Sequence, residues 1–127
     1  MSYKILVADD SNIVRAVIAK TLRLAGMQVG ELFEAENGKE ALDILRRQWI
    51  DLVFADIHMP VMTGLELIEQ MSQDGILSSI PVVVVSAEGN APRIESLKKK
   101  GISAYIRKPF TPEELRRIVS DLLVGAL

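Results

Sequence analysis

Residues 5–10 read Ile5-Leu6-Val7-Ala8-Asp9-Asp10, four consecutive apolar residues followed at once by two aspartates. A continuous apolar run of this kind predicts a strand of a parallel sheet that is covered on both faces. Further strands are predicted where similar short apolar runs recur, over Leu52–Ala55, Val82–Val85, Ala104–Ile106 and Val29–Ala35. The sequence therefore predicts five strands.

Helical patterns alternate with these strands. Helices are predicted over Lys39–Arg47, Leu65–Met71 and Ala91–Lys100, and two more segments repeat apolar residues at three- and four-residue spacing. The first of these two contains Ile13, Val14, Val17, Ile18 and Leu22, and the second contains Leu115, Ile118, Val119, Leu122 and Leu123.

Cap residues mark the ends of these helices. Thr111-Pro112-Glu113-Glu114 combines an N-cap threonine, a proline at the first helical position and a capping-box glutamate. The cap-then-glutamate spacing recurs from Thr63 to Glu66 and from Asn37 to Glu40, and three glycines stand where helices should stop, Gly26, Gly75 and Gly101. The order βαβαβαβαβα predicts one α/β domain over residues 1–127, a doubly wound parallel sheet with helices on both faces.

Composition narrows the functional classes. The 127 residues carry a net charge of −2, which argues against a strongly basic nucleic-acid binder. The absence of cysteine and the single histidine exclude disulfides, thiolate catalysis and zinc sites built from Cys or several His. Because no apolar run approaches the roughly 18–20 residues of a membrane span, we expect a cytoplasmic protein without membrane insertion. The apolar end, Leu122–Leu127, packs as helix, contacts a partner or marks where a longer protein was cut.

Polar residues follow four of the strands. Asp9 and Asp10 come after the first strand, Asp56 after the third, Ser86 after the fourth and Lys108 after the fifth. Ligands of open α/β sheets bind at the carboxyl ends of the strands, so we expect these side chains to lie together. Singly, each has a plainer interpretation, since Asp10-Ser11-Asn12 or Ser86 could cap a helix and Lys108 could be a surface charge.

Three carboxylates in one place repel one another, and one lysine cannot neutralise them. A divalent cation such as Mg²⁺, which prefers oxygen ligands and often holds phosphate oxygens, is the natural partner. A carboxylate beside such an ion can act as a nucleophile toward phosphorus and form an aspartyl phosphate. Ser86 and Lys108 would then supply donors to the phosphoryl oxygens.

Together these residues resemble the receiver domain of two-component response regulators. The resemblance rests on Asp9-Asp10, on Asp56 with Met59-Pro60 and Gly64 behind it, on Ser86-Ala87 and on Lys108-Pro109-Phe110, and it spans the whole chain. Gly64-Leu65-Glu66-Leu67 and Tyr105 are similar to the single-domain chemotaxis regulators of this family. The resemblance implies a flavodoxin-like (βα)5 fold with strand order 2-1-3-4-5.

The resemblance also implies a role for each site residue. Asp56 would accept the phosphoryl group from a histidine kinase or phosphotransfer protein. Asp10, Asp56 and the backbone carbonyl of His58 would ligate Mg²⁺, with Asp9 acting mainly through water. Lys108 would pair with Asp56 and then with the phosphoryl group, and the Lys108–Pro109 bond is a candidate for the cis form.

A switch follows from these roles. Ser86 would hydrogen-bond the phosphoryl group, and its movement would draw Tyr105 inward. The segment Ala91–Lys100 is suited to move because its apolar face is thin, essentially Ala91, Ile94 and Leu97. The resemblance implies a signalling switch rather than an enzyme, which assists its own phosphorylation and dephosphorylation. It would control a protein target through the face of helix 4, strand 5 and helix 5, without direct nucleic-acid binding.

Other interpretations remain open. The chain could be the receiver part of a longer transcription factor or signalling enzyme, or a pseudo-receiver that binds partners without phosphate. The last strand and helix carry three arginines, Arg107, Arg116 and Arg117. These could mark a homodimer interface, or they could equally form a solvated face. A haloacid-type phosphatase is disfavoured by His58 at its second aspartate position, and a flavodoxin-like FMN carrier by the repulsion of phosphate from Asp9-Asp10.

One residue and one segment depart from the family pattern. His58 stands where chemotaxis regulators commonly carry asparagine. Its side chain either alters the lifetime of the phosphoryl group or is that of an exposed loop histidine without a role. Gly89-Asn90-Ala91-Pro92-Arg93 differs from a flagellar-motor regulator, which leaves the downstream target open.

Overall fold

Five strands and five α-helices alternate along residues 2–123, the part of the chain that this computed structural model describes. All the predicted elements are confirmed, with ends shifted by one or two residues, and a short 3-10 helix, η1 (Leu77–Ser79), was not predicted. The strands are β1 (Tyr3–Ala8), β2 (Val29–Ala35), β3 (Leu52–Ala55), β4 (Val82–Ser86) and β5 (Ala104–Arg107). The helices are α1 (Asn12–Leu24), α2 (Gly38–Arg47), α3 (Gly64–Ser72), α4 (Ala91–Lys99) and α5 (Pro112–Leu122).

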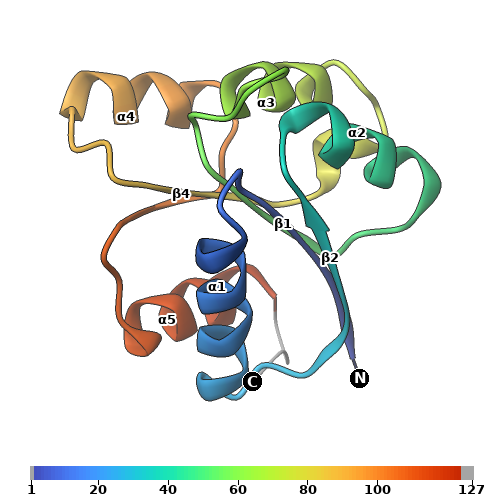
Figure 1. The fold of residues 1–127 in the computed structure, drawn as a ribbon. Helices are drawn as coiled ribbons and strands as arrows, with labels where there is room; N and C mark the ends of the chain where they lie inside the picture. Colours follow the sequence, from blue (N-terminus) through green and yellow to red (C-terminus); the bar gives the residue numbers. More distant parts are fainter. Residues whose placement is uncertain (1, 124–127) are drawn as a thin grey trace.

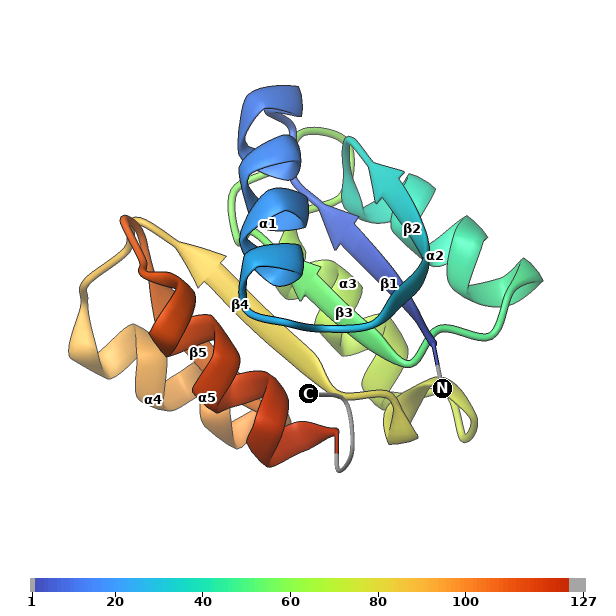
Figure 2. The same cartoon turned by 90° about the horizontal axis from the view of Figure 1, so that it is seen from below.

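The strands form one parallel sheet in the order β2-β1-β3-β4-β5, as expected. Helices α1 and α5 cover one face of the sheet, and α2, α3 and α4 cover the other (Figures 1 and 2). Because β1 lies between β2 and β3, the direction of winding reverses beside β1. Such a reversal leaves a crevice at the carboxyl ends of β1 and β3, where ligands of this fold bind.

The central strands are buried on both faces, which explains their continuous apolar sequences. In β1, Ile5 and Val7 pack into the core under α1 and α5, whereas Leu6 and Ala8 pack into the core under α2, α3 and α4. Strands β3 and β4 alternate in the same way, and every residue of both is buried. The two cores hold the sheet between the helical layers.

The backbone hydrogen bonds between neighbouring strands continue for one residue past the strand ends, and they fix the backbone of the residues that follow. The amide of Asp9 donates to the carbonyl of Ala35 at 3.0 Å, and the amide of Asp56 donates to the carbonyl of Ala8 at 3.0 Å. The amide of Lys108 donates to the carbonyl of Ser86 at 2.8 Å. The carboxyl ends of β1, β2 and β3, and those of β4 and β5, are therefore held in register at one edge of the sheet.

The helix starts follow the predicted cap chemistry with one difference. Ser11, within the Asp10-Ser11-Asn12 segment that was predicted as a possible cap, caps α1, because its hydroxyl accepts from the amide of Val14. Thr63 forms the expected capping box with Glu66. Thr111 caps α5 through the amide of Glu114, but the Glu114 carboxylate contacts the Thr111 hydroxyl instead of completing the box at the backbone.

The apolar stripe predicted for α1 is only partly buried. Ile18 and Leu22 lie in the core, whereas Ile13 is 73% exposed and Val17 is 50% exposed. Three- and four-residue spacing spans more of the helix circumference than the sheet can cover, so one side of the stripe faces solvent.

Helix α4 is held by little apolar contact, as its sequence predicts. Leu97 is fully buried, Ile94 is half-buried and Ala91 is exposed. Gly101 ends this helix with a φ of +102°, and Gly26 follows α1 with a φ of +89°. Gly75 does not have a positive φ, and it lies in the turn between α3 and η1.

The end of α5 packs on the sheet. Leu122 and Leu123 are half-buried against the core under α1 and α5, and the rest of the predicted apolar end, 124–127, lies outside the described residues. Within residues 2–123, none of the helices combines the length and apolar composition that a bilayer crossing needs.

The loop from β3 to α3 returns tightly past the end of β3. The amide of Gly64 donates to the carbonyl of Ile57 at 2.9 Å, and a Cβ at Gly64 would lie 2.1 Å from the Asp56 carbonyl oxygen. Any side chain at position 64 would therefore push α3 away from the backbone that carries Asp56.

We expect Gly64→Ala to lower the free energy of unfolding by about 3 kcal/mol, because the backbone must shift to admit the methyl group. The matched control is Gly75→Ala, whose Cβ would meet nothing within 4 Å and which should change the free energy by less than about 0.5 kcal/mol. Urea denaturation followed by circular dichroism measures both. Equal stability of the two variants would contradict the close packing at Gly64.

Candidate functional site

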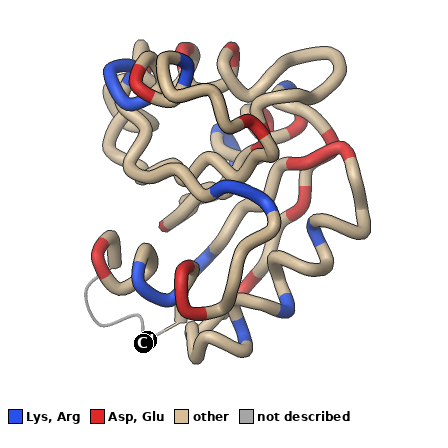
Figure 3. Tube along the Cα trace, turned by 90° about the vertical axis from the view of Figure 1, so that its left-hand side faces the viewer, with Lys and Arg blue, Asp and Glu red and all other residues tan. Residues whose placement is uncertain are grey.

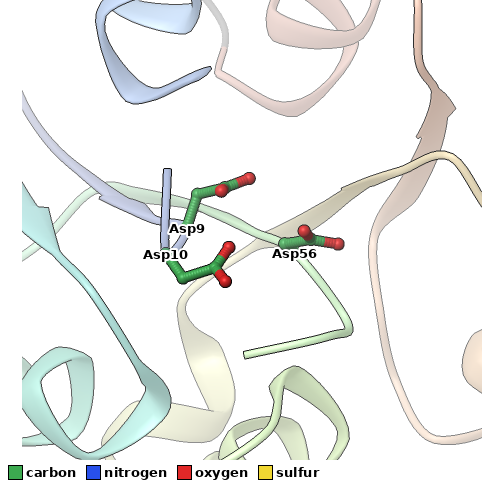
Figure 4. A group of neighbouring side chains, drawn as sticks. All are labelled: Asp9, Asp10 and Asp56. Atoms are coloured by element: carbon green, nitrogen blue, oxygen red, sulfur yellow. The ribbon is translucent and has the colours of Figure 1, made fainter. Parts of the chain in front are cut away.

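Three aspartates meet at the carboxyl ends of β1 and β3. One carboxylate oxygen from each of Asp9, Asp10 and Asp56 lies within 4.8 Å of the others (Figure 4). Asp9 is buried, Asp56 is half-buried and Asp10 is exposed, so the group spans from the protein interior to solvent. The sequence prediction that these three side chains converge is confirmed.

Lys108 joins two of these carboxylates. Its Nζ lies 3.0 Å from Asp9 Oδ2 and 3.5 Å from Asp56 Oδ2, with 23% of its side chain exposed. The expected pairing with Asp56 is therefore accompanied by a closer contact with Asp9. The two contacts place the ammonium between the ends of β1 and β3, and the Lys108–Pro109 bond that follows is cis, as expected.

The donor set is suited to a hard divalent cation. Three ionised carboxylates and one ammonium leave an excess of negative charge, which a cation would relieve. All the side-chain ligands are oxygens, the ligand type that Mg²⁺ prefers. The exposed Asp10 leaves one side of the group accessible to solvent, where such an ion could keep several waters.

Ser86 and Tyr105 meet the same loop from two strands. Ser86 is buried at the end of β4, and its Oγ accepts a hydrogen bond from the amide of Glu88 at 3.2 Å. The Tyr105 hydroxyl, from β5, donates a short hydrogen bond to the carbonyl of Glu88. The segment between β4 and α4 is thus attached to both predicted switch residues. Asn90, not Ser86, caps α4.

His58 and Glu88 face each other between two loops. The His58 side chain is 64% exposed, and its Nε2 lies 3.9 Å from Glu88 Oε2. Sequence reasoning did not single out Glu88, although it lies only two residues after Ser86. Its backbone contacts and its carboxylate connect Ser86, Tyr105 and His58, which makes this residue part of the site.

Burial raises the pKa of the Tyr105 phenol above its usual value of 10.0, and the nearby Glu88 carboxylate adds to this effect. The folded state therefore favours the neutral phenol. The stabilisation that comes from keeping the Tyr105 phenol neutral is fully present below pH 10, and it is lost as pH rises through the folded-state pKa of Tyr105.

We expect ultraviolet titration of the phenolate to place the Tyr105 midpoint above pH 10, because ionisation requires a charge in a partly desolvated position. Tyr3 is the only other tyrosine, so the difference between wild type and Tyr105→Phe isolates this titration. Alkaline loss of stability should be smaller in Tyr105→Phe. A midpoint at or below pH 10 would show that the phenol is solvated.

Comparison with known proteins agrees with this geometry. The family model of the response regulator receiver domain matches residues 5–120. A chemotaxis protein CheY homolog of Campylobacter jejuni is 36% identical over 121 residues, covering 94% of this chain and 92% of that protein.

Solved structures have the same architecture. Chemotaxis protein CheY4 of Vibrio cholerae matches with a TM-score of 0.84 and 29% identity, covering 97% of this chain and all of that one. The fold is also similar to the receiver domain of a sensor histidine kinase from Pseudomonas aeruginosa, whose structure has a magnesium ion in its active-site cleft. That match has a TM-score of 0.83 and 24% identity, over 96% of this chain and 98% of that one. With its strand order, its acidic group and its match over most of the chain, this protein belongs to the response regulator receiver domain family, as a receiver of the CheY type.

Proposed function

We propose that residues 1–127 form one receiver domain in which Asp56 accepts a phosphoryl group from a histidine kinase or a histidine phosphotransfer protein. The observation that carries this proposal is the contact of Lys108 with two members of a three-carboxylate group at the ends of β1 and β3. That arrangement supplies a nucleophile, a cation site and a fixed positive charge in one crevice.

Asp56 is the best placed of the three carboxylates to be the nucleophile. Asp9 has 3% of its side chain exposed, and its two oxygens accept from the Ser11 amide at 2.9 Å and from Lys108. The oxygens of Asp56 likewise accept from the Ile57 amide at 2.7 Å and from Lys108, but its side chain is more exposed, at 13%. Asp56 therefore combines access from solvent with a neighbouring ammonium.

Mg²⁺ would be held by Asp10 and Asp56 with the backbone carbonyl of His58, and Asp9 would act mainly through water. When bound, the ion would neutralise carboxylate and phosphoryl charge. Transfer forms a bond from an Asp56 carboxylate oxygen to phosphorus while the bond from phosphorus to the donor imidazole nitrogen breaks. The electron pair of that bond stays on the imidazole, which takes up a proton.

The remaining residues respond to the new charge. Lys108 pairs with the phosphoryl oxygens, and the Ser86 hydroxyl turns from the Glu88 amide to donate to one of them. Because Tyr105 is hydrogen-bonded to Glu88 in the same loop, this movement changes how β5 and α4 meet. A downstream protein would read the change on the face formed by α4, β5 and α5.

The charges of this protein suit contacts with other proteins. Acidic and basic positions are interspersed on the side drawn in Figure 3, instead of forming a field of one sign. Arg107, Arg116 and Arg117 are exposed on β5 and α5, so this face could also pair with a second copy. A receiver within a longer signalling protein, or an interaction module without phosphoryl transfer, would use the same surface.

We expect incubation with Mg²⁺ and acetyl phosphate to add one phosphoryl group to the wild type but none to Asp56→Asn, because the amide cannot act as the nucleophile. The matched control, Asp43→Asn, changes an exposed aspartate on α2 and should be modified like the wild type. Intact mass measures the gain, and a chelator should abolish it. No gain in any variant, with no Mg²⁺ binding, would leave a phosphorylation-independent module.

We expect His58→Asn to shorten the lifetime of the phosphoryl group severalfold. The shorter side chain would not reach the Glu88 carboxylate, so the loop after β4 would lose one of its contacts beside the acidic group. Loss of the phosphoryl group is followed by intact mass after removal of the donor. Glu88→Gln, which keeps the size of the side chain but removes its charge, tests the same contact from the other side. Equal lifetimes in wild type and His58→Asn would assign the histidine no role.

A further inference from the structure

Arg15 is a buried cation that the proposed chemistry does not use. Only four polar or charged residues in the described part of the chain are buried, namely Asp9, Arg15, Thr21 and Ser86. Asp9 and Ser86 belong to the site, and Thr21 donates to the carbonyl of Val17 within its own helix. Arg15, at 7% exposure in the first turns of α1, therefore needs a separate explanation.

The guanidinium joins two elements next to the acidic group. Its Nη1 donates to the backbone carbonyl of Asp9 at 2.5 Å, and its Nε donates to Glu34 Oε1 at 2.9 Å. Glu34 lies near the end of β2, opposite Val7 of β1 in the sheet register, and half of its side chain is exposed. Arg15 thus ties the start of α1, the end of β2 and the loop after β1 to one another.

With the bond from Arg15, the amide, the carbonyl and both carboxylate oxygens of Asp9 each have a hydrogen-bond partner. Its amide donates to the carbonyl of Ala35 at 3.0 Å, and its carboxylate accepts from Ser11 and Lys108. The bond from Arg15 adds the carbonyl, which belongs to the peptide that leads into Asp10. The Asp10 side chain is exposed, so the backbone is its main restraint. The orientation of this peptide sets the direction in which the Asp10 side chain leaves the backbone.

We propose that Arg15 is a positioning residue for the divalent cation: it orients the Asp9–Asp10 peptide so that the carboxylates meet as a preformed site. This inference rests on the proposed function, since it concerns the same Mg²⁺ site. Glu34 holds the guanidinium in place and balances its charge. Arg15 itself does not contact the ion.

The direction in which Mg²⁺ affinity changes when Arg15 is replaced distinguishes a positioning role from a purely electrostatic one. A positive charge close to a cation site repels the cation, so removal of the Arg15 charge alone would tighten Mg²⁺ binding. Loss of the hydrogen bond to Asp9 has the opposite effect, because the carboxylates must then be ordered when the ion binds. Residues that orient metal ligands typically contribute about tenfold or more to metal affinity.

The test is calorimetric titration of Mg²⁺ into the wild type, Arg15→Met, Arg15→Lys and Arg23→Met. Arg15→Met should weaken binding about tenfold, although it removes a positive charge. Arg15→Lys keeps the charge and one donor toward Asp9, so it should bind with intermediate affinity. The matched control, Arg23→Met, makes the same change at an exposed position of α1 and should bind like the wild type.

Two further measurements keep the outcomes distinct. Circular dichroism and thermal unfolding without Mg²⁺ establish that each variant is folded at the titration temperature, and the amide resonance of Asp10 reports the orientation of its peptide. Arg15→Met that is folded and binds Mg²⁺ as tightly as the wild type, or more tightly, would overturn the positioning role. If Arg15→Met does not fold, unchanged affinity in both Arg15→Lys and Glu34→Gln would overturn it. Absence of Mg²⁺ binding by the wild type would instead refute the proposed function.

Discussion

The parallel pairing of β1 with β3 is the constraint on which the acidic site depends. Ala8 lies opposite Ala55, and the next residue of each strand is an aspartate. The hydrogen bond from the Asp56 amide to the Ala8 carbonyl carries this register past the strands. Two like charges are thereby held together by the buried sheet, and the burial of the central strands supplies the free energy that opposes their repulsion.

The rest of the site moderates that repulsion without removing it. Lys108 follows β5, which is the edge strand of the sheet opposite β2, and its ammonium contacts Asp9 and Asp56. Asp10 is exposed to solvent. Arg15 is neutralised by Glu34 and contributes hydrogen bonds more than charge. The site therefore keeps an excess of negative charge at the ends of β1 and β3, which favours a small cation as its partner.

The sequence was sufficient to predict the elements and the convergence of Asp9, Asp10, Asp56 and Lys108, because parallel strands present their carboxyl ends at one edge. Strand order came from the family resemblance, since the apolar runs alone do not say which strands are neighbours. The exposure of Ile13 and Val17 was not predicted, because spacing defines a stripe but not which part of it the sheet covers. The contacts of Glu88 and Arg15 were missed because charged residues in a loop or on a helix are usually solvated, and these contacts depend on elements distant in sequence.

The thin attachment of α4 has a consequence for how such proteins diverge. Leu97 is the one fully buried side chain of this helix, so most of its surface positions contribute little to the stability of the fold. Substitutions there alter neither the register of β1 and β3 nor the acidic crevice. The outer surface of α4 can therefore accumulate substitutions, and with them a different surface chemistry, without disturbing the acidic group at the ends of β1 and β3.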